Sequence, residues 1–366
     1  MLTRVEIENY RGFKSYRMEG LAQVNLIVGK NNTGKTALLE GIQFLTSGGD
    51  SDVLAASADR RGEEIVRGPE RPTMVEIGHF FYGHSIAPNV SFSISGNNGF
   101  APVSVKVVAL KEGRPSGDDQ PKVRAAPVRF ALRVDGPRRA GNEAPLFLIT
   151  RDGGVNMEEP RVWRSGLPGR PLDESPIRFI GTEHLDTARI AELWDEVQVA
   201  GENESVLSAL QLLEPKLMSF FMLSGLSVHG YSGTRAGPMV RFESQDRPIP
   251  LGSLGEGMRR LLALSTSLAA TSEGFLFVDE IDTGLHYSVM ADMWKLVIKK
   301  ALASNVQVFA TTHSWDCIEG LSTLCQRDPE LVNRVSIHKV DRALQNSVAF
   351  SGESLVRMLR SDIDPR

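Results

Sequence analysis

The feature that most constrains this chain is a glycine-rich run that matches the pattern GxxxxGK[ST]. It reads Gly29-Lys30-Asn31-Asn32-Thr33-Gly34-Lys35-Thr36. The nearly continuous apolar run 24–28 precedes it and favours a strand buried on both faces. After it, Leu38, Ile42 and Leu45 are spaced as one face of a helix. A loop between such elements presents backbone N–H groups to phosphate, so the run predicts nucleotide binding in an α/β fold.

Each part of this run has an expected role. The glycines allow the backbone from Gly29 to Thr36 to wrap closely around phosphates. Lys35 is expected to reach the β and γ phosphates, which makes it a catalytic candidate. The Thr36 hydroxyl is expected to contact Mg²⁺. The run therefore predicts a nucleotide that binds together with a magnesium ion.

A second pattern lies far along the chain, where the apolar run 275–278 ends in Asp279 and Glu280. The carboxyl end of a parallel strand is where ligands bind in such sheets. Asp279 is expected to hold Mg²⁺, directly or through water, and Glu280 to polarise the attacking water. Taken alone, the pattern fits a strand that ends in two solvated acids equally well.

Three stretches in the second half of the chain resemble the motifs of ABC-type ATPases. They are 253–260 (Ser-Leu-Gly-Glu-Gly-Met-Arg-Arg), 279–286 (Asp-Glu-Ile-Asp-Thr-Gly-Leu-His) and 309–314 (Phe-Ala-Thr-Thr-His-Ser). The resemblance implies that ATP is the nucleotide and that Ser253, Gly255 and Glu256 form a signature motif, which binds the γ-phosphate of the opposite subunit. It also implies that His313 hydrogen-bonds the γ-phosphate and is a catalytic residue. Transporters of this class usually have Gly at the position of Leu254 and Asp at that of His286, and no Q-loop glutamine can be assigned.

The combined motifs are similar to those of bacterial OLD-like and RecF-like ATPases over 1–50 and 245–345, and the middle of the chain is similar only in its architecture. In this class a basic residue near the nucleotide corresponds to Arg11, for which a solvated hairpin charge is the alternative. The long coiled coil of SMC-type proteins is missing between Thr36 and Ser253. The residues after His313 are too few for the Toprim nuclease domain of full OLD proteins.

The order of the patterns predicts three units. An ABC-type ATPase head with a mostly parallel core sheet is expected from 1–66 and 245–366. An inserted antiparallel β lobe is expected over 67–155, where apolar residues alternate with polar ones between turn signals. A loop and a helical subdomain are expected over 156–244, because helical spacing runs from 183 to 223.

Composition limits the classes of partner. The net charge is −4, so any DNA contact must come from a local basic patch or a partner protein. The two cysteines exclude a disulfide scaffold and a four-thiolate zinc site. The N-terminus lacks an apolar signal-peptide core, and no apolar run is long enough to span a bilayer. We therefore expect a cytoplasmic protein that does not associate with a membrane.

The resemblance implies a function as an ATP-hydrolysing switch. ATP would be sandwiched in a homodimer, or in a higher homo-oligomer, that controls a separate effector in bacterial anti-phage defence. That effector would be a Toprim or HNH nuclease, or a toxin. The alternative is a RecF-like DNA-repair ATPase whose DNA binding is gated by ATP. A transporter ATPase and a module that holds ATP without turnover fit the sequence less well.

Overall fold

The computed structural model describes residues 1–65, 74–110, 129–137, 144–157, 176–183, 187–227, 234–245, 247–361 and 363–366. Most of the loop expected at the start of the third unit, over 155–175, lies outside these ranges. No helix in the described part of the chain is long and apolar enough to cross a membrane.

A six-stranded sheet forms the centre of the molecule, as expected for an α/β fold. Its strands occur in the order β11-β15-β16-β3-β17-β18. Their bounds are β3 (Val24–Val28), β11 (Ile177–Ile180), β15 (Phe275–Val278), β16 (Gln307–Thr312), β17 (Val335–Lys339) and β18 (Val348–Ser351). The first five strands pair in parallel, and β18 pairs antiparallel with β17. Strands β3 and β15 are buried throughout, because both faces of the sheet are covered.

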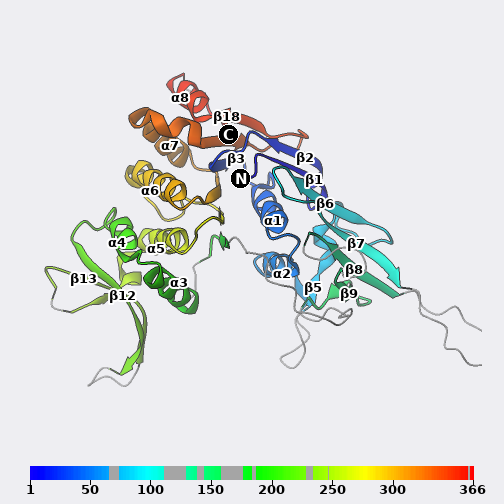
Figure 1. Cartoon of the computed structure of the whole chain (residues 1–366), viewed down its shortest axis with the longest axis horizontal. Helices are drawn as coiled ribbons and strands as arrows, with labels where there is room; N and C mark the ends of the chain where they lie inside the picture. Colours follow the sequence, from blue (N-terminus) through cyan, green and yellow to red (C-terminus); the bar gives the residue numbers. More distant parts are fainter. Residues whose placement is uncertain are drawn as a thin grey trace, which may run out of the picture.

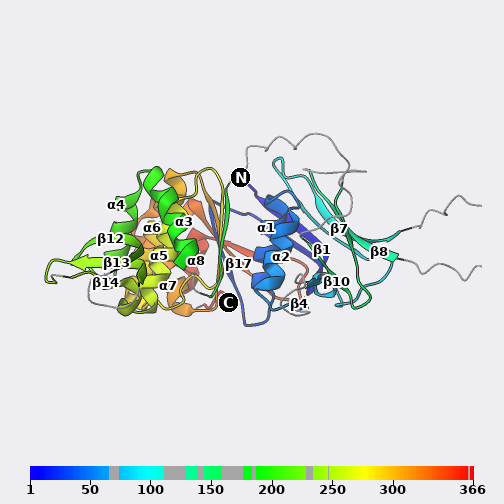
Figure 2. The same cartoon turned by 90° about the horizontal axis from the view of Figure 1, so that it is seen from below.

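Helices cover one face of this core sheet (Figures 1 and 2). They are α3 (Thr187–Val199), α4 (Asn203–Leu210), α5 (Glu256–Ala269), α6 (Met290–Ala303), α7 (Trp315–Arg327) and α8 (Gly352–Arg360). Every second residue of each strand, such as Leu276 and Val278 of β15, packs with these helices in one apolar cluster. The residues between them point to the opposite face, because successive side chains of a strand alternate between its two faces.

That opposite face is covered by α1 (Lys35–Thr46), α2 (Ser51–Asp59) and a second, antiparallel sheet (Figure 2). Its strand order is β2-β1-β6-β7-β8-β9. The bounds are β1 (Arg4–Tyr10), β2 (Phe13–Glu19), β6 (Ser91–Gly96), β7 (Val103–Leu110), β8 (Arg129–Asp135) and β9 (Leu146–Leu148). Phe277 and Phe309 stack here with ring centroids 5.4 Å apart. Because β1 pairs with β6, the hairpin 4–19 belongs to the same sheet as the expected insert. The division of the chain at residue 66 stays a prediction.

The segment before α5 differs from the expectation. Helices α3 and α4 form, but Leu217 begins a strand, so the helical interpretation of 183–223 is wrong for its last residues. Strands β12 (Leu217–Ser227) and β13 (Thr234–Phe242) form a long ribbon beside α3 and α4, and β14 (Ile249–Pro250) extends it (Figure 1). A short apolar run rich in aromatic residues, such as 217–223, does not distinguish a strand from a buried helix by its periodicity.

The remaining elements are short. Strands β4 (Glu64–Ile65), β5 (Met74–Glu76) and β10 (Gly154–Val155) form a small sheet. Short 3₁₀ helices occur at η1 (Ile77–Phe80), η3 (Leu251–Leu254), η4 (Tyr287–Val289) and η5 (Pro329–Arg334). Two of these turns border the motif runs of the sequence, because η3 overlaps the start of 253–260 and η4 directly follows 279–286.

Candidate nucleotide-binding site

The glycine-rich loop connects the end of β3 to the start of α1. Its backbone conformation and the atoms packed around it allow only glycine at its two motif glycine positions. Gly29 and Gly34 have φ values of 152° and 100°, which side chains other than that of glycine rarely allow. A Cβ atom on Gly29 would lie 2.7 Å from the Val340 carbonyl oxygen, and one on Gly34 would lie 2.5 Å from Cζ of Phe13. The loop is therefore held between the β1–β2 turn and the end of β17.

Lys35 is the first residue of α1, and its side chain folds back over the loop. The residue is 8% exposed, and its Nζ donates hydrogen bonds to the carbonyl oxygens of Gly29 (2.8 Å) and Lys30 (3.0 Å). Burial lowers the pKa of Lys35, while Asp279 and Glu280 act in the opposite direction. Gly34, the N-cap residue of α1, has no side chain to occupy the first N–H groups of the helix. This helix end is therefore suited to bind an anion.

Asp279 follows β15 and is hydrogen-bonded to the first turn of α1 and to β16. Thr36 Oγ1 donates a hydrogen bond of 2.8 Å to Asp279 Oδ2, and Thr311 Oγ1 donates one of 2.5 Å to Oδ1. This arrangement arises because β3, β16 and β15 are neighbours and all end at the same edge of the sheet. A hydroxyl and a carboxylate are the kind of oxygen donors that Mg²⁺ prefers, so Thr36 and Asp279 fit the expected metal chemically.

Glu280 lies at the same edge with a backbone conformation that is rare for its residue type. Its φ is 48°, in the left-handed region. The Glu280 N–H donates to Thr311 Oγ1 at 2.8 Å, and its carboxylate Oε1 lies 3.5 Å from His313 Nδ1. The side chains of Glu280 and His313 are 37% and 49% exposed. The backbone of Glu280 is thus fixed, while its carboxylate remains accessible beside His313.

These elements surround a cavity of about 470 Å³. The described residues that line it are Arg11, Gly12, Asn31, Asn32, Thr33, Gly34, Lys35, Thr36, Ala37, Arg61, Glu63, His84, Asp279, Glu280 and Arg342. The fold therefore places Lys35 and Thr36 of the first motif beside Asp279 and Glu280 of the second. His313 is connected to the cavity through Glu280.

Arg11 lines the cavity, but its guanidinium group is engaged in ion pairs. It is 4% exposed, with Nε 3.1 Å from Glu40 and Nη1 2.7 Å from Glu63. The alternative of a solvated hairpin charge is therefore wrong. Contact between Arg11 and a nucleotide stays a prediction.

The signature residues lie at a different place. Ser253 is in η3 and Gly255 precedes α5; both are exposed, and neither is among the described residues that line the cavity. Glu256 begins α5 and packs against Gly284, where a Cβ atom would lie 2.5 Å from its Cγ. A Cβ atom on Gly257 would lie 2.7 Å from the Gly284 carbonyl oxygen. The start of α5 is therefore in close contact with the segment that follows Asp279 and Glu280.

Three residues that organise this site were not among the residues predicted from the sequence. Arg260 of α5 is 4% exposed and donates hydrogen bonds to the carbonyl oxygens of Gly181 (2.7 Å), Asp279 (2.6 Å) and Glu280 (2.7 Å). Its position within the signature run was the available signal. Thr311, the second, lies two residues before His313. Arg342 had no signal in the sequence, because it lies on the loop after β17.

Several known proteins are similar to this chain. Residues 24–316 match the family model described as "AAA domain, putative AbiEii toxin, Type IV TA system". An ATP/GTP phosphatase of Helicobacter pylori is 23% identical over 343 residues, which cover 87% of each chain. The DNA replication and repair protein RecF of a Marinomonas strain is 49% identical over 47 residues, which cover 13% of each chain.

Among solved structures, SMC head domains align with nearly the whole of this chain. The head domain from Thermotoga maritima has 16% identity and a TM-score of 0.41, and the comparison covers 96% of this chain and 98% of that one. An SMC head bound to the C-terminal winged-helix domain of ScpA has 13% identity and a TM-score of 0.48, with coverage of 96% and 97%. The match of the family model spans most of the sequence, and the chain therefore belongs to this AAA domain family.

Proposed function

We propose that this chain binds ATP with Mg²⁺, hydrolyses it, and works as a dimeric switch that controls a separate effector protein. One observation carries the enzymatic part of this proposal. Lys35, Thr36, Asp279 and Glu280 come from two distant motifs and line the same cavity. This is the set of groups that phosphoryl transfer to water requires for positioning and for charge stabilisation.

In the proposed reaction, Lys35 and the N–H groups at the start of α1 bind the phosphates. Thr36 and Asp279 hold Mg²⁺, which when bound offsets the negative charge of the phosphates. Glu280 orients the attacking water and accepts its proton at the carboxylate. His313, which is within 3.5 Å of Glu280, donates a hydrogen bond to the γ-phosphate.

The dimeric part of the proposal rests on where the signature residues lie. Ser253 and Gly255 are exposed and are not among the described residues that line their own cavity, so they are accessible to a nucleotide held by a second copy. In a two-fold pair each chain would supply its loop to one site and its signature to the other. Each of the two sites would then be complete only in the dimer.

Mixing two inactive variants tests this arrangement. Lys35→Ala removes phosphate binding in its own site, and Ser253→Arg blocks the signature that serves the other site. Each variant alone should be inactive. A heterodimer of the two retains one intact site, so an equal mixture should recover about a quarter of the wild-type rate by random pairing. ATPase activity in Ser253→Arg alone, or no recovery on mixing, would contradict the shared site.

The effector is proposed to be a Toprim or HNH nuclease, or a toxin, in anti-phage defence. The family description, which mentions a toxin and a toxin–antitoxin system, is compatible with such a role. The test is to isolate tagged Glu280→Gln from its host in the presence of Mg²⁺ and ATP, with Lys35→Ala as the control. A nuclease or toxin that accompanies only the first variant would support the proposal.

The similarity to RecF over 47 residues keeps the DNA-repair function as a second candidate. It predicts that the isolated chain binds DNA in an ATP-dependent and salt-sensitive manner. Gel-shift titrations with duplex and junction DNA, each with and without ATP, distinguish the two functions. Strong ATP-dependent binding without any effector would favour the RecF-like function.

A further inference from the structure

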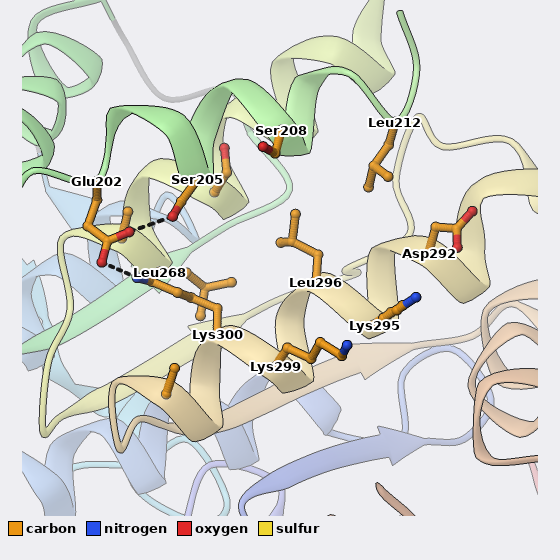
Figure 3. A pocket seen from close by; sticks show the side chains of 13 residues that line it. Glu202, Ser205, Ser208, Leu212, Leu268, Asp292, Lys295, Leu296, Lys299 and Lys300 are labelled. Carbon is orange, nitrogen blue, oxygen red and sulfur yellow. Dashed lines mark hydrogen bonds and ion pairs between the residues drawn. The ribbon is translucent and has the colours of Figure 1, made fainter. Parts of the chain in front are cut away.

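A groove between helices of the helical layer is drawn in Figure 3, and its described lining shares no residue with that of the nucleotide cavity. Helix α4 forms one wall, α6 forms the other, and α5 forms the floor. Its volume is about 570 Å³, within the range of specific binding sites. None of the motifs that predicted nucleotide binding contributes a residue to its described lining.

The floor of the groove is apolar. Leu212 and Leu296 extend into the space between α4 and α6 (Figure 3), Leu268 and Ala269 of α5 are buried in the floor, and Ala303 is exposed near the end of α6. Leu212 and Leu296 are partly exposed, although both also pack against the main apolar cluster. Ser205 and Ser208 of α4 line one wall. The groove therefore offers apolar contacts along its floor and polar groups at its sides.

The rim carries a distinctive pattern of charge. At one end, Lys300 of α6 pairs with Glu202 at 2.6 Å, and this contact lowers the pKa of Glu202. Lys295 and Lys299 are exposed, and no ion pair joins either of them to a carboxylate in the part of the chain that the structure describes. Asp292 lies at the opposite end. Two cations thus remain available on a protein whose net charge is −4.

The spacing of Lys295 and Lys299 matches that of charged groups on a helical partner. Lys295 and Lys299 are one helical turn apart on α6, about 6 Å along its axis. Carboxylates four residues apart on a second helix have the same spacing. The lining residues of α6 run from Asp292 to Ala303, a length of about 17 Å, which matches a helix of about three turns.

We propose that this groove binds an acidic amphipathic helix of a partner protein. Its apolar face would lie on the partly exposed Leu212 and Leu296, in the manner of helix-in-groove recognition. Its carboxylates, one turn apart, would pair with Lys295 and Lys299 at the rim.

The position of the groove also relates it to the proposed switch. Helix α5, its floor, begins in the signature motif and is bonded through Arg260 to the carbonyls of Asp279 and Glu280. Helix α6, its wall, begins shortly after that same segment. A bound helix would therefore contact α6 and lie directly over α5, the two elements that lead to the nucleotide cavity. This coupling rests on the proposed ATPase function, whereas the docking itself does not.

A displayed library of helical peptides tests the docking with the full chain. Peptides of about four turns carry leucines on one face, and the flanking positions are randomised among Glu, Lys, Gln, Ser and Ala. We expect selection to enrich glutamates one turn apart. Synthetic copies of the enriched peptides should bind at least about tenfold more weakly to Lys295→Glu/Lys299→Glu and to Leu296→Asp in fluorescence anisotropy.

Matched variants make the outcome decisive. Lys106→Glu/Arg357→Glu makes the same change of charge at exposed residues outside the groove and should bind the peptides as the wild type does. Melting temperatures establish that every variant is folded. Enrichment of basic or neutral peptides, equal binding by the lysine variants, or no enrichment at all would overturn the proposal. Lys35→Ala should retain full peptide binding, so failure of the ATPase proposal remains distinguishable from failure of this one.

Discussion

Glu280 combines a strained backbone with an accessible carboxylate, and its neighbours hold it in that state. Its φ of 48° lies in the left-handed region. Its N–H donates a hydrogen bond to the Thr311 hydroxyl, and its carbonyl oxygen accepts one from Arg260. Such strain persists only where surrounding contacts determine the conformation, and it is frequent at functional sites. The carboxylate can therefore be changed without disturbing the backbone that presents it.

Glu280→Gln should retain ATP binding and lose hydrolysis. Glutamine has the same shape but cannot accept the proton of the attacking water, so we expect a rate at least about 100-fold lower. Binding of a fluorescent ATP analogue and single-turnover hydrolysis measure the two properties separately. Hydrolysis at the wild-type rate would show that another residue orients the water.

Arg260 is expected to act as a positioning residue. It is buried, and it fixes the backbone after β15 from a different helix. Lysine lacks the planar fork that reaches several carbonyls at once, so Arg260→Lys should displace Glu280 slightly. We expect kcat to fall about tenfold to a hundredfold while KM for ATP changes little. Arg357→Lys, at an exposed residue of α8, is the control and should leave both constants unchanged.

His338 should make the stability of the fold depend on pH. It is fully buried on β17 between the hydroxyls of Ser336 and Ser347, and burial lowers its pKa to about 4. The unfolded chain, with a histidine pKa near 6.5, binds more protons between these values. Stability should therefore be complete above pH 6.5 and decrease as the pH falls to 4, by about 3 kcal/mol from this residue.

The comparison with His338→Gln isolates this contribution. Glutamine does not titrate, so the difference in unfolding free energy between wild type and variant should change across this range of pH. Urea denaturation at several pH values measures that difference. A difference that stays constant between pH 6.5 and 4 would contradict the assignment.

At the scale of elements, the sequence predicted those whose patterns are local and unambiguous. The run 24–28 and the glycine-rich loop predicted β3 and the start of α1, and 275–278 predicted β15. The ribbon β12–β13 was missed because Leu217 to Leu223 is apolar except for Ser219, which suits either kind of element. The pairing of β1 with β6 was also missed, because sequence patterns do not reveal which distant strands become neighbours.

The same limit applies within the site. Lys35, Thr36, Asp279 and Glu280 could be proposed because each belongs to a motif with a known physical role. The hydrogen bonds that Arg260 donates to backbone carbonyls depend on how α5 packs, and the position of Arg342 at the cavity depends on how the loop after β17 packs. The positions of Arg260 and Arg342 in the sequence do not indicate which groups they contact. Contacts of this kind arise only from the tertiary fold.

The contact between α5 and the segment after β15 should be sensitive to a single methyl group. A Cβ atom on Gly257 would lie 2.7 Å from a backbone oxygen of Gly284, which cannot move as a flexible side chain can. We expect Gly257→Ala to destabilise the protein by about 1–2 kcal/mol and to lower the rate of hydrolysis. At Gly181 the nearest atom would be 3.8 Å away, so Gly181→Ala should be tolerated. Denaturation and ATPase assays on both variants test this difference.

At the scale of the molecule, the core sheet separates two apolar clusters. Leu276 and Val278 belong to the cluster with α5, α6 and α7, whereas Phe275 and Phe277 belong to the one with α1 and the antiparallel sheet. The glycine-rich loop and the signature helix lie on opposite faces of this sheet, and both approach the edge where β15 ends. A second copy related by a two-fold axis could therefore bring its signature to the loop of the first.

ATP should accordingly drive the formation of a dimer when hydrolysis is blocked. With Mg²⁺ and ATP, Glu280→Gln is expected to elute at twice the mass of one chain in size-exclusion chromatography with light scattering. Without nucleotide, or with Ser253→Arg added to the same chain, it should remain monomeric, because the signature would no longer reach the γ-phosphate. A dimer that forms equally well without ATP would place the interface elsewhere. A monomer that binds ATP tightly would show that the exposed signature motif does not complete the site.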